Sequence, residues 1–246
     1  NTGIGRINPD GSKGSCSACH SRHRFSLVVS RQPDSCGKCH MGPDHPQKEI
    51  YEESKHGIAF KAFKEDMRLD AQPWRAGIEY SAAPTCATCH MSATEELPVT
   101  HDVGTRISWN LRPPISEKID AKAIKAGEQV VPWEERRKKM KVVCKKCHAE
   151  NYVNGFYLQF DSAINLYNEK FGKPATSIIK MMKAGGVLTA TNFDEELEWT
   201  YFYLWHHEGR RARHGAAMMA PDYTQWHGFF EVAERFYIHF VPQVRE

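Results

Sequence analysis

The stretch CATCHMS, residues 86–92, places two cysteines three positions apart, with a histidine directly after the second. Such a stretch could hold zinc, cycle as a redox-active dithiol or carry a covalently attached haem. The three interpretations imply unrelated proteins, so the other cysteines of the chain have to decide between them.

All eight cysteines of the 246-residue chain lie in four CxxC pairs, and each pair is followed directly by a histidine. Zinc would need two pairs to share one tetrahedral ion, and it would have no use for the adjacent histidine. A thioredoxin-like dithiol needs one such motif beside a βαβ pattern rather than four among loops. Neither alternative explains the pattern.

A c-type haem uses every part of the motif. The two thiols become thioethers to the haem vinyl groups, and the histidine that follows binds the iron as the proximal ligand. The sequence therefore predicts four covalently attached haems of type c. Their attachment sites are Cys16, Cys19 and His20; Cys36, Cys39 and His40; Cys86, Cys89 and His90; and Cys144, Cys147 and His148.

The balance of charge gives no reason to expect nucleic acid as a partner. The polypeptide has 33 Lys and Arg residues against 30 Asp and Glu residues, which gives a formal net charge of +3. Four haems add eight propionates and about one positive charge for each ferric iron, so the total falls to roughly −1. No apolar run is long enough to span a membrane, and we therefore expect no transmembrane segment.

The haem chemistry also predicts a cellular compartment. Haem of type c is attached outside the cytoplasm, so we expect an extracytoplasmic protein, in the periplasm or, for an anammox organism, in the anammoxosome lumen. The chain opens at Asn1 without an initiator methionine or a signal peptide. This opening indicates a mature terminus after processing or the start of a fragment.

The residue pattern predicts a mainly α fold around a core filled by haem. Four haems amount to about one for every 60 residues, so the polypeptide mainly wraps porphyrin. The first cysteines of the motifs are 20, 50 and 58 residues apart, which excludes a constant repeat. We expect a tetrahaem cytochrome region over residues 1–150 and a C-terminal helical region over residues 151–246.

Glycine and proline residues mark the ends of the expected helices. Gly185 and Gly186 predict the end of one helix, and Pro221 predicts the start of the last. Pro113 and Pro114 require an extended segment over residues 109–116. Almost no alternating strand pattern is present. Helices are expected over residues 50–63, 121–131, 157–170, 175–184, 194–213 and 222–240.

Nine of the 13 histidines are not proximal ligands and can serve the second face of an iron. An iron with two histidines is saturated and carries electrons, whereas an open face permits chemistry. We expect four six-coordinate haems, with distal ligands that include His23, His56 and His101. One or two histidines of the C-terminal helices could serve as well, namely His206, His207, His214 and His227. We interpret Met41 and Met91, which follow proximal histidines, as packing residues.

The run EERRKKMKVVCKK, residues 134–146, surrounds the fourth motif with positive charge. One interpretation is a solvated helix face whose charges balance haem propionates. The other is a docking patch for an acidic redox partner such as a cytochrome. The sequence leaves both open.

Four long stretches of the chain resemble the octahaem hydroxylamine oxidoreductase family, which includes the hydrazine dehydrogenases. They are GIGRINPDGSKGSCSACHSRHRFS (3–26), CGKCHMGPDHPQKEIYEESKHGI (36–58), PVTHDVGTRISWNLRPPIS (98–116) and HHEGRRARHGAAMMAPDYTQWHGFFEVAERFY (206–237). Members of that family carry eight haem motifs, and this chain, with four, is similar to their C-terminal half. The family's catalytic haem is the fourth, so its counterpart would lie upstream of Asn1, in the same protein or in a separate chain.

The resemblance implies specific roles for three residues. In the family a tyrosine bonds covalently to the catalytic haem of a neighbouring subunit in a trimer, and its counterpart is Tyr223. An alternative is that Tyr223 is an ordinary core residue. A distal Asp–His pair accepts protons in the family, and the corresponding dipeptide is Asp44 and His45. His23 is an equally good carrier of that histidine, and His45 could instead be structural or an axial ligand.

The resemblance also implies a function. It predicts an enzyme that oxidises hydroxylamine, to nitric oxide or nitrite, or hydrazine, with this chain mainly relaying electrons through haems that have two histidine ligands. A related enzyme that reduces nitrite is one alternative, although absence of the tyrosine accompanies that direction in the family. A pure electron-transfer cytochrome without a substrate site is the other alternative.

Overall fold

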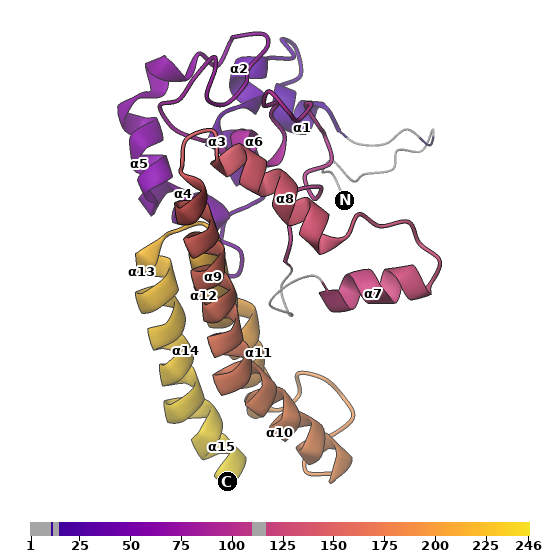
Figure 1. Cartoon of the computed structure of the whole chain (residues 1–246). Helices are drawn as coiled ribbons and strands as arrows, with labels where there is room; N and C mark the ends of the chain where they lie inside the picture. The colour runs from indigo at the N-terminus through magenta and orange to yellow at the C-terminus, as the bar shows by residue number, and fades with distance from the viewer. Residues whose placement is uncertain (1–10, 12–14, 110–116) are drawn as a thin grey trace. The chain divides into compact units, whose positions relative to one another are not determined.

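The computed structural model describes residues 11, 15–109 and 117–246 (Figure 1). Helices dominate these residues, and β-structure among them is limited to two isolated bridges, Arg75 with Ala93 and Ala76 with Tyr80. The predicted mainly α fold is confirmed. None of the described helices is long and apolar enough to cross a membrane. Of the segment predicted to be extended, residues 110–116 lie outside the described residues.

The chain forms two compact units that alternate along the sequence. The first contains residues 1–40, 56–107 and 134–153, and the second contains residues 41–55, 108–133 and 154–246. Each unit is therefore built from three separate segments. All four CxxCH motifs lie within the first unit. The boundary between residues 150 and 151 that we drew from the sequence stays a prediction.

The first unit consists mainly of short helices joined by long loops. Most of its helices carry or flank the cysteine motifs, and glycine and proline in the loops limit their length. They are α1 (Ser17–His20), α2 (Leu27–Ser30), α3 (Pro33–Gly37), α5 (Lys55–Ala62), the 3₁₀-helix η1 (Lys64–Met67), α6 (Cys86–His90) and α8 (Trp133–Cys144).

Polar contacts around a buried tryptophan hold two loops of the first unit together. The Arg31 guanidinium lies over the Trp74 ring, 4.7 Å from its centroid. It also donates hydrogen bonds to the carbonyls of Leu69 and Ala71, at 2.5 and 2.8 Å. The indole N–H of Trp74 in turn donates to the carbonyl of Met67 at 2.8 Å. Side-chain bonds to loop carbonyls thus replace the backbone ladder that regular structure would supply.

The second unit is built from longer helices, several of which are extended by π-helical turns. Its elements are α4 (Gln47–Glu53), α7 (Glu117–Lys125), α9 (Glu150–Tyr167), the π-helix η2 (Asn168–Gly172), α10 (Lys173–Ala184), α11 (Glu196–Tyr203), the π-helix η3 (Leu204–Glu208), α12 (Gly209–Ala217), α13 (Pro221–Thr224), the π-helix η4 (Gln225–Phe230), α14 (Glu231–Glu234), the π-helix η5 (Arg235–Phe240) and α15 (Val241–Arg245).

These elements join into three continuous helical runs over residues 150–184, 196–217 and 221–245. The first run ends before Gly185 and Gly186, and Gly186 has a φ of 71°, which is a left-handed conformation that favours glycine. The last run begins with Pro221 at its first position. Both boundaries are those that the sequence predicted.

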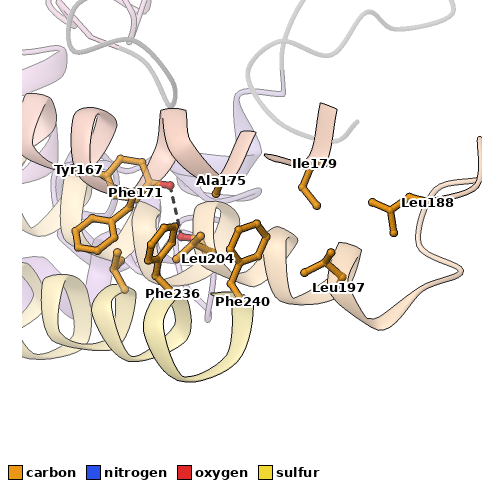
Figure 2. Packing of buried hydrophobic residues seen from close by; sticks show 10 residues of the cluster. Tyr167, Phe171, Ala175, Ile179, Leu188, Leu197, Leu204, Phe236 and Phe240 are labelled. Atoms are coloured by element: carbon orange, nitrogen blue, oxygen red, sulfur yellow. Dashed lines mark hydrogen bonds between the residues drawn. The ribbon is translucent and has the colours of Figure 1, made fainter. Parts of the chain in front are cut away.

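An aromatic and aliphatic cluster packs the three runs against one another (Figure 2). The Tyr167 hydroxyl adds a polar link, because it donates to the Leu204 carbonyl of the second run at 3.5 Å. The buried members of the cluster are Tyr167, Phe171, Ala175, Ile179, Leu188, Leu197, Leu204, Val232, Phe236 and Phe240.

The second run approaches Tyr167 so closely that only glycine fits at one position. A Cβ atom at Gly209 would lie 2.6 Å from the Tyr167 hydroxyl oxygen. The guanidinium of Arg213, which is 2% exposed, lies over the same ring at 4.4 Å from the centroid. The tyrosine ring is therefore held between a glycine backbone and a buried cation.

We expect Phe240→Ala to destabilise the second unit by about 3–5 kcal/mol, because it leaves a cavity at a fully buried position. Ile238→Ala is the matched control, because Ile238 is 65% exposed two residues away on the same helix, and it should change the free energy of unfolding by less than about 1 kcal/mol. Denaturant unfolding followed by far-ultraviolet circular dichroism measures both. Equal losses in the two variants would contradict the packing of Figure 2.

Candidate haem-binding sites

Each CxxCH motif forms one helical turn. In the first, second and fourth motifs the backbone N–H of the histidine donates to the carbonyl of the first cysteine, at 2.9, 3.0 and 3.0 Å. The third motif is helix α6, whose start is closed by a capping box between Thr85 and Thr88. Because residues three apart on a helix share a face, the turn brings both thiols of a motif to one side. This arrangement suits attachment to the two vinyl groups of one haem.

Two hydrogen-bonding side chains fix the third motif. Arg106, which is buried, donates to the carbonyls of Cys89 and Ser92 at 3.1 and 2.7 Å and so satisfies the end of α6. The ring of His90 donates from Nδ1 to the Val103 carbonyl at 3.3 Å. This bond fixes the tautomer and leaves Nε2 as the nitrogen that can bind a metal.

Two histidine pairs lie at the separation that a six-coordinate haem iron requires. The ring centroids of His20 and His101 are 6.3 Å apart, and those of His56 and His148 are 6.0 Å apart. With metal–nitrogen bonds of about 2 Å on both faces of an iron, two imidazole centroids stand about 6 Å apart. The residues present therefore fit a haem at the first and at the fourth motif.

The electrostatics of both pairs agree with this geometry. Burial lowers the pKa of His20 and of His56, and the facing histidine lowers each pKa further. Both rings consequently favour the neutral form, which is the form that a metal binds.

The thiols show that the motifs are neighbours in the order of the sequence. Burial raises the pKa of the Cys19 thiol, and the nearby Cys36 thiol raises it further. The thiols of Cys36 and Cys86 interact, which lowers the pKa of Cys36 and raises that of Cys86. Burial raises the pKa of Cys89 to about 12, with a further contribution from Cys144. The first motif thus adjoins the second, the second adjoins the third, and the third adjoins the fourth.

Two further residues near the motifs, His23 and Met41, are interpreted from the sequence as a distal ligand and a packing residue. The side chain of His23 is exposed, and within the described part of the chain no ring contact joins it to a proximal histidine. Its role as a distal ligand stays a prediction. Met41 is 50% exposed, so its packing role in the polypeptide alone is small.

Asp44 and His45 form part of a charged cluster in the second unit. The Asp44 carboxylate is hydrogen-bonded to Nδ1 of His45, and its other oxygen lies 3.7 Å from His206 and 3.4 Å from Arg210. Burial acts to raise the pKa of Asp44, but the charges of His45 and His206 outweigh it, so the pKa is lowered. The cluster therefore holds an ionised carboxylate against two imidazoles, an arrangement that can accept and pass a proton.

Tyr223 lies in α13 at a close approach between α12 and α13. A Cβ atom at Gly215 would lie 2.7 Å from the carbonyl carbon of Tyr223, so glycine is required there. The Tyr223 ring is partly buried, with its centroid 5.3 Å from that of His227. Burial raises the pKa of the phenol, and the carboxylate of Glu53 raises it further. Tyr223 is thus a neutral phenol near several carboxylate side chains.

Sequence reasoning missed Arg106 and Arg210. Arg106 lies 16 residues after the third motif, and no local sequence pattern predicts its contact with the carbonyls of α6. A signal did exist for Arg210, because it lies four residues after His206 and residues at that spacing share a helix face.

The basic run around the fourth motif is largely engaged within the first unit. Arg136 donates to the Ile107 carbonyl at 2.5 Å, and Lys146 pairs with Glu96 at 2.6 Å. Lys138 pairs with Glu135 one turn away on the same helix at 2.5 Å. The two interpretations of this run, a solvated face and a docking patch, both stay predictions.

Residues 9–195, which include all four motifs, match a family described as seven times multi-haem cytochrome CxxCH. The chain is also 35% identical over 165 residues to a probable nitrite reductase-hydroxylamine oxidoreductase fusion protein of Kuenenia stuttgartiensis. That alignment covers 56% of this chain and 19% of the relative, so the chain spans about a fifth of the relative's length.

Two solved structures share the fold. A hypothetical multiheme protein superimposes with a TM-score of 0.83 at 26% identity, over 100% of this chain and 60% of the other. A reducing HAO-like protein complex of Kuenenia stuttgartiensis superimposes with a TM-score of 0.62 at 22% identity, over 94% of this chain and 59% of the other. The chain therefore spans about three fifths of each solved chain.

We expect denaturing mass spectrometry of the protein to give the polypeptide mass plus four haems, because the thioether bonds survive unfolding. A Cys86→Ala, Cys89→Ala double variant should carry three haems, since it removes both attachment points of α6. A wild-type mass with fewer haems, or zinc in elemental analysis, would contradict the assignment of the four motifs.

Proposed function

The chain belongs to the multihaem cytochrome CxxCH family, and we propose that it relays electrons through four covalently bound haems. The order of the motifs in space carries this proposal. Neighbouring thiols join the first motif to the second, the second to the third and the third to the fourth. Haem iron with two histidine ligands supplies reversible one-electron transfer. Four haems held in an unbroken series would allow electrons to pass from one haem to the next, which favours a function in electron transfer.

We further propose that His101 is the distal ligand at the first motif and His56 the distal ligand at the fourth. The separations of 6.3 Å from His20 and 6.0 Å from His148 support these assignments. His23 remains a candidate for one of the other two motifs.

Replacement of a distal histidine should open one face of one iron. In His56→Gly we expect one of the four haems to change from low-spin to high-spin, because the iron loses its sixth ligand. Electron paramagnetic resonance of the oxidised protein measures the change, and added imidazole should reverse it. His239→Gly, at an exposed position of η5, is the control and should leave four low-spin signals. A high-spin iron already present in the wild type would contradict six-coordination throughout.

The substrate we propose is hydroxylamine or hydrazine, oxidised at a catalytic haem that this chain does not itself attach. The name of the 35% identical relative includes a hydroxylamine oxidoreductase, which supports this class of reaction. Oxidation of hydroxylamine to nitrite releases four electrons together with protons, so the site needs a proton acceptor beside the electron relay. Asp44 and His45, oriented by Arg210, are the proposed acceptor.

Tyr223 is proposed to bond to that catalytic haem from another subunit of a homo-oligomer, which we expect to be a trimer. Its partly buried position on α13 and its place in the stretch APDYTQWHG support the proposal. Electrons would leave to a separate cytochrome. Because multihaem c-type cytochromes are typically extracytoplasmic, we place this reaction in the periplasm or an equivalent compartment.

A related enzyme that reduces nitrite is the second candidate. The same relative is named in part as a nitrite reductase, which favours this direction equally. The optical spectrum separates the two, because a haem cross-linked to tyrosine has a ferrous absorption band to the red of ordinary c-type haem.

We expect Tyr223→Phe to remove the red-shifted ferrous band and most of the hydroxylamine oxidation, because the variant lacks the phenol oxygen. The oligomer should also lose its resistance to denaturing electrophoresis, while the count of attached haems stays at four. Tyr237→Phe, at a position of η5 that is 60% exposed, is the matched control and should behave as the wild type. Normal oxidation of hydroxylamine by Tyr223→Phe would leave the electron relay as the function.

A further inference from the structure

A groove of about 480 Å³ lies in the second unit between the helical run that contains α9 and the last helical run, which are side by side (Figure 1). Its apolar lining includes Leu166 and Phe171 from the first of these runs and Phe229 and Tyr237 from the last. Among the residues that the structure describes, Lys170 is the one charged residue that lines the groove, and it makes no ion pair with any of them. The groove is therefore an apolar surface that contains an unpaired cation.

The last helical run carries a second exposed surface, which we call the ridge. It consists of exposed residues at every fourth position, namely Trp226, Phe230, Glu234 and Ile238. A π-helical turn holds more residues than the 3.6 of an α-helical turn, so a spacing of four stays on one face where the two kinds of turn alternate, as they do here. Trp226 and Phe230 stack with ring centroids 4.7 Å apart, although they are 57% and 51% exposed.

The ridge and the groove are complementary in polarity and in charge. Glu234 lies among the apolar residues of the ridge and has no ion-pair partner within the described part of the chain, whereas Lys170 carries the opposite charge in the groove. Exposed apolar surfaces with aromatic rings are typical of protein–protein interfaces, and opposite charges within them select the partner and its register. Because one chain carries both surfaces, a second copy of the chain supplies the complement to each.

We propose that the ridge of one copy docks in the groove of a second copy, with Glu234 of the first paired to Lys170 of the second. The two surfaces are different, so the contact is head-to-tail and can repeat from copy to copy until a ring closes. Tyr223 lies in the first turn of the helical run that carries the ridge, so docking also brings this residue toward the neighbouring copy. The proposal rests on the homo-oligomer of the proposed function, and on neither its cross-link nor its substrate.

Sedimentation velocity of the full holoprotein over a wide range of concentration tests the contact. The parent protein and all its variants carry Tyr223→Phe, which removes the proposed covalent link and leaves non-covalent association to be measured. We expect Lys170→Glu and Glu234→Lys each to raise the dissociation constant about tenfold, because like charges then face each other. Both substitutions in one chain should restore most of the affinity, since the pair forms again with its charges exchanged. Trp226→Ala should weaken the association about tenfold or more.

Lys180→Glu is the matched control, at an exposed position of the same helical run that does not line the groove. It should associate as the parent does and should not restore the affinity of Glu234→Lys. A parent that stays monomeric at every concentration would overturn the proposal. So would single variants of unchanged affinity, or a double variant as weak as the two single losses combined. Wild-type protein without the red-shifted band or without hydroxylamine oxidation would contradict the proposed function alone, because the association is measured without the cross-link.

Discussion

Covalent attachment of haem requires two thiols and a proximal imidazole on a single helical turn, and the first unit is arranged to provide that turn four times. Each motif is a single short turn that can lie between long loops. Residues outside the motif therefore have to hold each turn in place. At α6 the capping box starts the turn and Arg106 ends it through the carbonyls of Cys89 and Ser92. Because the motif itself supplies so little packing, such contacts decide where a haem can sit.

Different interactions stabilise the two units. In the second unit, aromatic and aliphatic side chains of three helical runs form a continuous core, with Phe240 and Leu204 fully buried. In the first unit, side-chain hydrogen bonds to loop carbonyls, such as those that Arg31 donates, hold the loops together. Four porphyrins would supply the apolar surface that the first unit's polypeptide lacks.

Local chemistry made some of these features predictable. The cysteine motifs, the helix end at Gly185 and the helix start at Pro221 depend on neighbouring residues, so the sequence alone located them. The facing of His20 and His101 depends on tertiary structure across 81 positions of sequence, and no spacing rule reaches that far. The π-helical turns were also missed, because they arise from packing between runs rather than from a residue pattern.

The alternation of the two units has a consequence for biosynthesis. The first unit cannot be completed without residues 134–153, which follow the first three motifs in the chain. In the closed unit Cys89 is partly buried, and burial raises the pKa of its thiol, which makes the thiol less reactive. At the third motif we therefore expect haem attachment to be faster before the unit closes, while both thiols of α6 are still accessible.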